Sequence, residues 1–476
     1  MLFNSIEFFI FFVVVFSLYW LLSHRHQNIL LLVANCIFYA SWNWRFLFLL
    51  LLCKAVSYYA ADRIYASNHQ GTRRLWLWLG LGFNLGSLLF FKYCNFFLVN
   101  LYQLLHAVGI PYAGKTLDII LPMGISFFTF QAMSYTIDVY RRVVKPTGNF
   151  IDYMVYVSFF PNLVAGPIER ATHLLPQVLK PRTWNTQEIK YGVYLIFLGL
   201  FQKMFVADNL AHIVNPVFAS PSSYQGLEVL IAMYAFVIQI FCDFAGYSNI
   251  ARGLGAMMGF KIMMNFNLPF WVTNVQEFWN RWHISLSQWV RDYLYFPLVG
   301  SLRKIKGNLR IYMALMISMT LLGLWHGAAW NFVVFGMYYG LLLCFYIVLR
   351  TRMGHWINPK SALWRGVWHW ARVIFMFHIT TLGMTLFRSS SLSQAWHVLS
   401  RLSAGPLHMP WDTLFKFLSF ALPILILEFA ELKTKDAFFI FTQMSWLWRT
   451  MLLAFMTYLL LGMGVMTSEE FIYFQF

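Results

Sequence analysis

Charged side chains are scarce in this sequence. They make up 11% of the 476 residues, whereas hydrophobic residues make up 60%. About one-quarter of a soluble globular domain is charged, so this chain has too little charge to cover a solvated surface. The scarcity argues against an ordinary soluble domain and favours a protein surrounded by lipid.

Several signatures of soluble enzymes and of metal sites are also missing. The five cysteines are scattered through apolar segments, and no two of them have the CxxC spacing. The sequence has no P-loop, no GxSxG elbow, no HExxH and no Gly-rich dinucleotide fingerprint. We therefore predict no metal site and no tightly bound cofactor, and we interpret the cysteines as small packing residues.

Long apolar runs occupy most of the chain. Residues 6–22, 119–139 and 311–349 carry almost no charge, and such runs can cross a hydrocarbon core of roughly 30 Å. The runs are continuous rather than alternating, which favours helices over barrel strands. We predict an all-α polytopic membrane protein with about eleven crossings of roughly 20 residues each. Because no internal repeat or soluble segment is present, we predict one domain over residues 1–476.

Two of the apolar runs contain residues that interrupt a helix. The polar residues 41–45 divide residues 29–61 into two short crossings. Pro161 and Pro167 interrupt residues 151–168, and a broken backbone at membrane depth is tolerated only inside protein or beside a cavity. We therefore predict a re-entrant element there.

The net charge of +17 would suggest nucleic acid as the partner of a soluble protein. Here the basic residues gather in short connections between apolar runs, as the positive-inside rule expects of cytoplasmic loops. These clusters are Arg63/Arg73/Arg74, Arg141/Arg142/Lys145, Lys180/Arg182/Lys190, Arg303/Lys304/Lys306/Arg310 and Arg350/Arg352/Lys360/Arg365. The charge pattern favours a lipid bilayer, and not nucleic acid, as the partner.

His326 lies in the middle of the uncharged residues 311–349. Basic loops flank this segment on both sides, so it must turn back on itself within the membrane. About 22 Å of helix separate Ile311 from His326 at 1.5 Å per residue. An ionisable residue at this depth is interpreted as functional, and the alternative is a structural imidazole that is hydrogen-bonded within the bundle.

A second histidine, His283, lies in a segment that is both aromatic and polar. One set of residues recurs at helical spacing and is apolar: Phe278, Trp282, Leu286, Trp289 and Tyr293. A polar set follows the same period: Asn280, His283, Ser287 and Arg291. The pattern predicts one amphipathic helix at an interface or along a cavity, and by itself it suggests an interfacial role for His283.

Asp243 ends an apolar run and would be expensive in the membrane without a partner. We expect it to form an ion pair or hydrogen bond that joins two helices.

The segments around both histidines resemble the motifs of membrane-bound O-acyltransferases. They read FWNRWHISLSQWVRDYLYFPLVG around His283 and LLGLWHGAAWNF around His326. Further similar segments read LPMGISFFTFQAMSYTIDVYRR, SFFPNLVAGPIERATHLLPQ and QIFCDFAGYSNIARGLGAMMGF. The resemblance is to the bacterial alginate O-acetyltransferase branch and is strongest over residues 1–400.

This resemblance implies tilted helices around a central tunnel, with His326 as the catalytic residue deep in the tunnel. It implies that His283 is also part of the catalytic site, in a positioning role. We assign substrate binding to Asn280, Arg281, Trp325 and Asn331. Because an alcohol is a poor nucleophile near neutral pH, we expect His326 to take its proton during attack on a thioester.

The resemblance further implies acetyl-CoA as a donor that enters from the cytoplasm. It implies a polysaccharide acceptor, such as alginate, outside the bacterial inner membrane and a periplasmic O-acetyltransferase partner. Acylation of peptidoglycan or teichoic acid is an alternative within the same family. From other classes, a transporter or flippase and a scaffold without chemistry remain open, although the chain lacks an inverted repeat.

Overall fold

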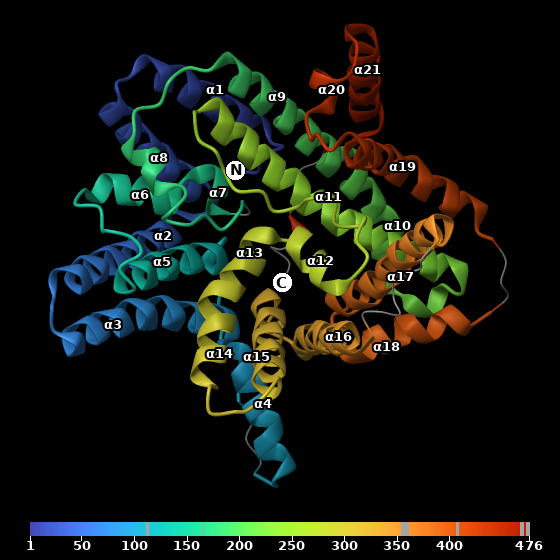
Figure 1. Cartoon of the computed structure of the whole chain (residues 1–476), viewed down its shortest axis with the longest axis horizontal. Coiled ribbons are helices and arrows are strands. Elements are labelled where there is room, and N and C mark those ends of the chain that lie inside the picture. Colours follow the sequence, from blue (N-terminus) through green and yellow to red (C-terminus); the bar gives the residue numbers. More distant parts are fainter. Residues whose placement is uncertain (111–113, 165, 354–360, 406–408, 467–470, 473–476) are drawn as a thin grey trace. The chain divides into compact units, whose positions relative to one another are not determined.

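The computed structural model describes residues 1–110, 114–164, 166–353, 361–405, 409–466 and 471–472. All regular structure in these residues is helical, which confirms the predicted fold class (Figure 1). Contacts between Cα atoms group the chain into two compact units, Met1–Ile196 with Ile250–Met263 and Phe197–Asn249 with Met264–Phe476. The single domain over residues 1–476 stays a prediction.

The first unit is built from the N-terminal helices and one end of α11. Its elements are α1 (Ile6–Leu21), α2 (His24–Ala66), α3 (Gln70–Leu88), the π-helix η1 (Leu89–Tyr93), α4 (Cys94–Ala107), α5 (Ile125–Tyr140), α6 (Phe150–Ser158), α7 (Phe160–Leu163), α8 (Leu175–Leu179) and most of α9 (Thr186–Leu200).

Both interruptions predicted in this unit are confirmed. Asn43 has non-helical dihedrals (φ −158°, ψ 107°) and kinks α2 within the polar residues 41–45. Phe159 leaves the helical region and separates α6 from α7, which contains Pro161. A proline in a helix interior would lose a backbone hydrogen bond and clash with the preceding turn, so the chain starts a new helix there. The re-entrant character of this segment stays a prediction.

The second unit contains both histidines singled out above. Its elements are the π-helix η2 (Phe201–Ala207), α10 (Asp208–Ala219), η3 (Pro221–Ser223), most of α11 (Leu227–Met257), α12 (Val275–Arg281), α13 (Ile284–Val290), the π-helix η4 (Arg291–Tyr295), α14 (Phe296–Ser301), α15 (Leu309–His326), α16 (Trp330–Met353), α17 (Ala362–Arg388), α18 (Leu392–Ser400), η5 (Arg401–Ser403), α19 (Trp411–Thr434), α20 (Phe439–Thr442) and α21 (Trp446–Met463).

Nine helices among the described residues are long and apolar enough to cross a membrane, so the chain is a polytopic membrane protein. The prediction was about eleven crossings. The kinked helix His24–Ala66 counts once among the nine, whereas the sequence predicted two short crossings there. Helices α1 and α5, also predicted as crossings, have 16 residues each, and at 1.5 Å per residue they are shorter than a hydrocarbon core of roughly 30 Å.

Candidate active site

His326 is the last residue of α15, at the turn of a tight helical hairpin. Helices α15 and α16 pack side by side, and residues 327–329 join them, which confirms the predicted turn (Figure 1). Glycines allow the two backbones to come this close, as in other membrane helix pairs. A Cβ at Gly323 would lie 2.2 Å from the Phe332 carbonyl oxygen, and one at Gly336 would lie 2.2 Å from that of Met319. The glycines therefore place His326 against the start of α16.

The imidazole of His326 is buried in an aromatic chamber, with 4% of the residue exposed. Its ring centroid lies 5.7 Å from that of Phe335 and 5.1 Å from that of Phe387, both at steep interplanar angles. Only glycine fits at position 327 of the turn, because a Cβ there would lie 2.1 Å from the Phe332 ring. The surrounding rings leave His326 almost no contact with solvent.

The segment around His283 is not the single amphipathic helix that was predicted. Helix α12 ends at Arg281, α13 begins at Ile284, and His283 between them is left-handed (φ 42°, ψ 55°). A non-glycine residue in this region is uncommon and often marks a functional site. His283 is fully buried, so the interfacial role that its period suggested is wrong. Local periodicity misses this break because no proline or glycine marks it.

A buried asparagine holds this left-handed turn. The Asn265 carbonyl accepts a hydrogen bond from the Ile284 backbone at 2.9 Å, and its Oδ1 accepts one from the Ser285 hydroxyl at 2.6 Å. Its Nδ2 donates to the Ser248 hydroxyl on α11 at 3.0 Å. In the same loop, the backbone amide of Asn267 donates a hydrogen bond to the Arg281 carbonyl at 3.0 Å. Asn265 thus joins α11 to the turn and compensates for its strained backbone.

Both histidines face the same indole. The Trp325 centroid lies 6.0 Å from that of His283 and 5.0 Å from that of His326. The two imidazoles can be no further apart than the sum of these distances. His283 also meets the Phe244 ring edge-on, with the ring centroids 4.6 Å apart. Residues more than forty positions apart in the sequence therefore form one buried site.

Burial also determines the protonation state of His283. It lowers the pKa of this imidazole to about 3, because desolvation disfavours the charged form. The ring is therefore neutral near pH 7. A neutral imidazole can donate one hydrogen bond and accept another, which suits it to orient a carbonyl or a hydroxyl.

Two predicted substrate-binding residues, Asn280 and Arg281, lie on α12. Asn280 is exposed and lines a cavity of about 430 Å³ between the α12–α13–η4 segment and the α15–α16 hairpin. Arg281 is half-buried and pairs with Glu277 at 2.9 Å. Arg291 and Arg350 also line the cavity, and the Arg291 guanidinium is paired with Asp292 at 2.7 Å. The cavity offers both positive charge and polar amides to a ligand.

Asn331 is buried, and its amide nitrogen is engaged by the end of α17. Nδ2 donates to the carbonyls of Leu386 at 3.3 Å and Ser389 at 2.7 Å. The last carbonyls of a helix lack intrahelical donors, so this contact caps α17. Its role in substrate binding stays a prediction.

The expected ion pair of Asp243 is confirmed. Its Oδ1 lies 2.8 Å from the ammonium of Lys203, in η2, and so joins that π-helix to α11.

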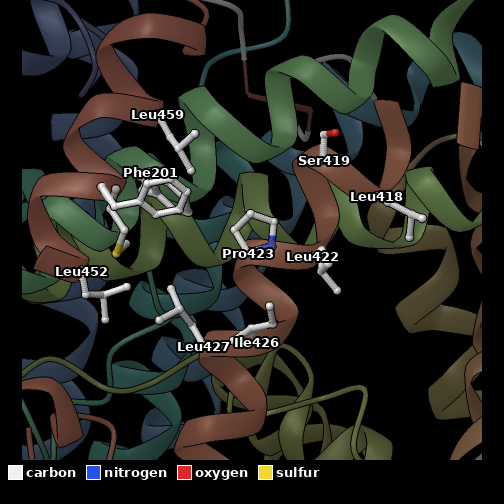
Figure 2. A pocket seen from close by; sticks show the side chains of 11 residues that line it. Phe201, Leu418, Ser419, Leu422, Pro423, Ile426, Leu427, Leu452 and Leu459 are labelled. Atoms are coloured by element: carbon white, nitrogen blue, oxygen red, sulfur yellow. The ribbon is translucent and has the colours of Figure 1, made fainter. Parts of the chain in front are cut away.

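A second cavity in this unit contains no titratable group. It measures about 240 Å³ and lies between η2, α19 and α21, where Phe201, Pro423 and Ile426 face it (Figure 2). Ser419 is the one polar side chain in its wall. Acyl transfer needs a proton acceptor, so this cavity is not the reaction site. Among the described residues, no cluster of three or more His, Cys, Asp or Glu side chains could hold a metal ion.

Sequence reasoning missed Asn265, Phe244 and Phe387. Phe244 lies in one of the family-like segments quoted above, but nothing local in the sequence singles out any of these three residues. Their positions beside the histidines follow from contacts between distant segments, which periodicity does not report.

Comparison with known proteins connects this geometry with a family. The model of the membrane-bound O-acyltransferases matches residues 141–389, which include both histidines and every predicted substrate-binding residue. The chain is 37% identical over 402 residues to a probable alginate O-acetylase of Azotobacter vinelandii, covering 84% of this chain and 77% of that protein. The chain belongs to the membrane-bound O-acyltransferase family. This membership decides for an O-acyltransferase over the transporter and scaffold alternatives.

Other members of the family have different acceptors in their names. A peptidoglycan O-acetyltransferase of Helicobacter pylori is 33% identical over 433 residues, covering 84% of this chain and 79% of its own. A teichoic acid D-alanyltransferase of Bacillus subtilis is 29% identical over 275 residues, covering 56% of this chain and 68% of its own. The names of these similar proteins therefore include alginate, peptidoglycan and teichoic acid.

Proposed function

We propose that this O-acyltransferase moves an acetyl group from cytoplasmic acetyl-CoA to an extracytoplasmic polysaccharide, alginate or a similar polymer. The observation that carries the proposal is the pair of buried histidines whose rings both lie within 6.0 Å of the Trp325 ring. The names of the O-acetylase relatives support acetyl as the group transferred, and their bacterial sources support the cytoplasmic membrane as the location. A periplasmic O-acetyltransferase is the proposed partner that completes delivery.

In this proposal His326 is the general base. It takes the proton of the attacking hydroxyl as the new C–O bond forms and the thioester C–S bond breaks. The proton then passes to the coenzyme A thiolate, so the base is regenerated. His283 and Trp325 can each donate a hydrogen bond to the carbonyl oxygen as it gains negative charge. The apolar walls around His326 strengthen such interactions because they exclude water.

The cavity beside Asn280 supports a donor with phosphate groups. Arg350 and Arg291 lie in its wall, the second paired with Asp292, and guanidinium groups bind phosphates well. Trp279 and Leu322 also line it; Leu322 lies one helical turn before His326 on α15, and Trp279 lies on α12, four residues before His283. We assign Asn280 and Arg281 to the donor side of the site, and Trp325 and Asn331 to the acyl side.

The test is release of coenzyme A by purified protein in detergent, with acetyl-CoA and an acceptor polysaccharide supplied. We expect release that falls at least 100-fold in His326→Ala. His369→Ala is the matched control, because His369 lies on α17 and is exposed. Release that is unchanged in His326→Ala would contradict the catalytic assignment. Acylation of the polysaccharide that needs an acylated carrier protein and proceeds without release of coenzyme A would replace acetyl-CoA as the donor.

A further inference from the structure

The end of α21 and described residues after it form hydrogen bonds with other elements of the second unit. Asn209 donates its amide to the carbonyl of Met463, the last residue of α21, at 2.8 Å. The Val465 amide donates to the Met204 carbonyl at 3.0 Å. Further along, the Ile472 amide donates to Oδ2 of Asp243 at 2.8 Å. These contacts attach the end of the chain to η2, α10 and α11.

The contact at Asp243 belongs to a buried ionic cluster. The Lys203 ammonium lies 2.8 Å from Oδ1 of Asp243 and 2.8 Å from Oδ1 of Asp208, and no more than 5% of any of the three side chains is exposed. Buried charges are stable only when paired and hydrogen-bonded, so this cluster holds Asp243 in one orientation. Its second oxygen is then directed at the Ile472 amide, and a hydrogen bond to a carboxylate is stronger than a neutral one.

The residue before Ile472 reaches the wall of the active site. The Phe471 ring lies 4.8 Å from the Tyr247 ring and 5.3 Å from the Phe244 ring. Phe244 in turn meets the His283 imidazole at 4.6 Å. Phe471 and Ile472 are both buried. An unbroken line of packed rings thus runs from Phe471 to His283.

We propose that Phe471 is a positioning residue of the transfer site. The Asp243–Ile472 hydrogen bond holds Phe471 against Phe244, and Phe244 keeps His283 in its left-handed, buried position. The proposal rests on the function proposed above, and it gives the end of this chain a role that the sequence did not indicate.

The test compares three variants with wild type. Phe471→Ala removes the ring, Phe471→Met restores its bulk, and Phe439→Ala removes an equally large buried ring from α20. One readout is coenzyme A release, as kcat and as KM for acetyl-CoA. The other needs no substrate: it is the rate at which diethyl pyrocarbonate modifies His283, measured by mass mapping of peptides.

We expect Phe471→Ala to lower kcat at least tenfold with KM changed less than twofold, and to speed modification of His283 at least tenfold. Phe471→Met restores both within threefold, and Phe439→Ala changes neither by more than twofold. A backbone test pairs Ile472→Pro, which loses the amide hydrogen, with Ile472→Val, which keeps it. The proline variant should behave like Phe471→Ala.

The outcomes separate the two proposals. If the modification rate of His283 is the same in Phe471→Ala as in wild type, or rises equally in Phe439→Ala, the positioning role is overturned. If His283 becomes accessible as expected but wild-type protein releases no coenzyme A in a His326-dependent manner, the positioning role stands and the proposed donor and reaction fail.

Discussion

The left-handed backbone at His283 allows its strain to be separated from its chemistry. His283→Gly and His283→Ala both delete a fully buried ring, so both lose the same packing against Phe244. The alanine variant keeps a Cβ at φ 42°, which costs roughly 1–2 kcal/mol in the left-handed region. Glycine has no such cost. However, its larger conformational entropy in the unfolded state destabilises the folded protein by about 0.5–1 kcal/mol relative to alanine. We therefore expect the glycine variant to be the more stable by about 0.5–1 kcal/mol.

The assay is reversible unfolding of the purified variants in mixed micelles, beside coenzyme A release under the conditions given above. Both variants should lose about 100-fold or more in kcat, the usual effect of removing a group that stabilises an oxyanion. Stability and activity would then change independently at one position. An alanine variant as stable as the glycine variant would refute the argument from strain. Wild-type activity in either variant would show that the imidazole has no part in the reaction.

Two further predictions concern pH and the hairpin. Because burial lowers the pKa of His283 from 6.5 to about 3, folding stability from this group is complete above pH 6.5 and is lost as the pH falls toward 3. The loss is at most about 1.4 kcal/mol per pH unit. Measured at several pH values, the free energy of unfolding should fall less steeply with decreasing pH in His283→Asn than in wild type. For the hairpin, Gly336→Ala should destabilise by about 1–3 kcal/mol and reduce activity, because its Cβ meets backbone of α15 that cannot move alone. Gly366→Ala on α17, where a Cβ meets nothing within 4 Å, should be neutral or slightly stabilising in the same unfolding assay, and equal effects of the two substitutions would contradict this packing.

Much of the architecture could be predicted because the bilayer restricts the choices. Helices are required wherever a long uncharged run crosses hydrocarbon, and the hairpin at residues 327–329 follows from basic loops at both ends of one run. The kink at Asn43 and the break at Phe159 follow from local polar and proline residues. About eleven crossings were predicted and nine candidate spans lie among the described residues, since composition does not fix where a helix such as α5 begins and ends.

The active site could be predicted only in part. His283 and His326 stand out in the sequence because ionisable residues are rare in this chain and because their motifs resemble a known family. Their meeting at Trp325 could not be predicted, since it needs the hairpin packing and the turn at His283 together. The same limit applies to Asn331, whose amide caps α17.

The sequence by itself determined that the chain is helical, lies in a membrane and carries two histidines of interest. It could do so because hydropathy, charge bias and short motifs are local properties. Tertiary structure decided that His283 is a buried left-handed residue rather than part of a polar helical face, because Asn265 supplies the hydrogen bonds that compensate for the strain. It also decided that Phe471 packs against Phe244 and that the Ile472 amide donates to Asp243, a carboxylate whose buried partners are distant in sequence. Such contacts depend on which segments pack together, and no periodicity within a segment reports that.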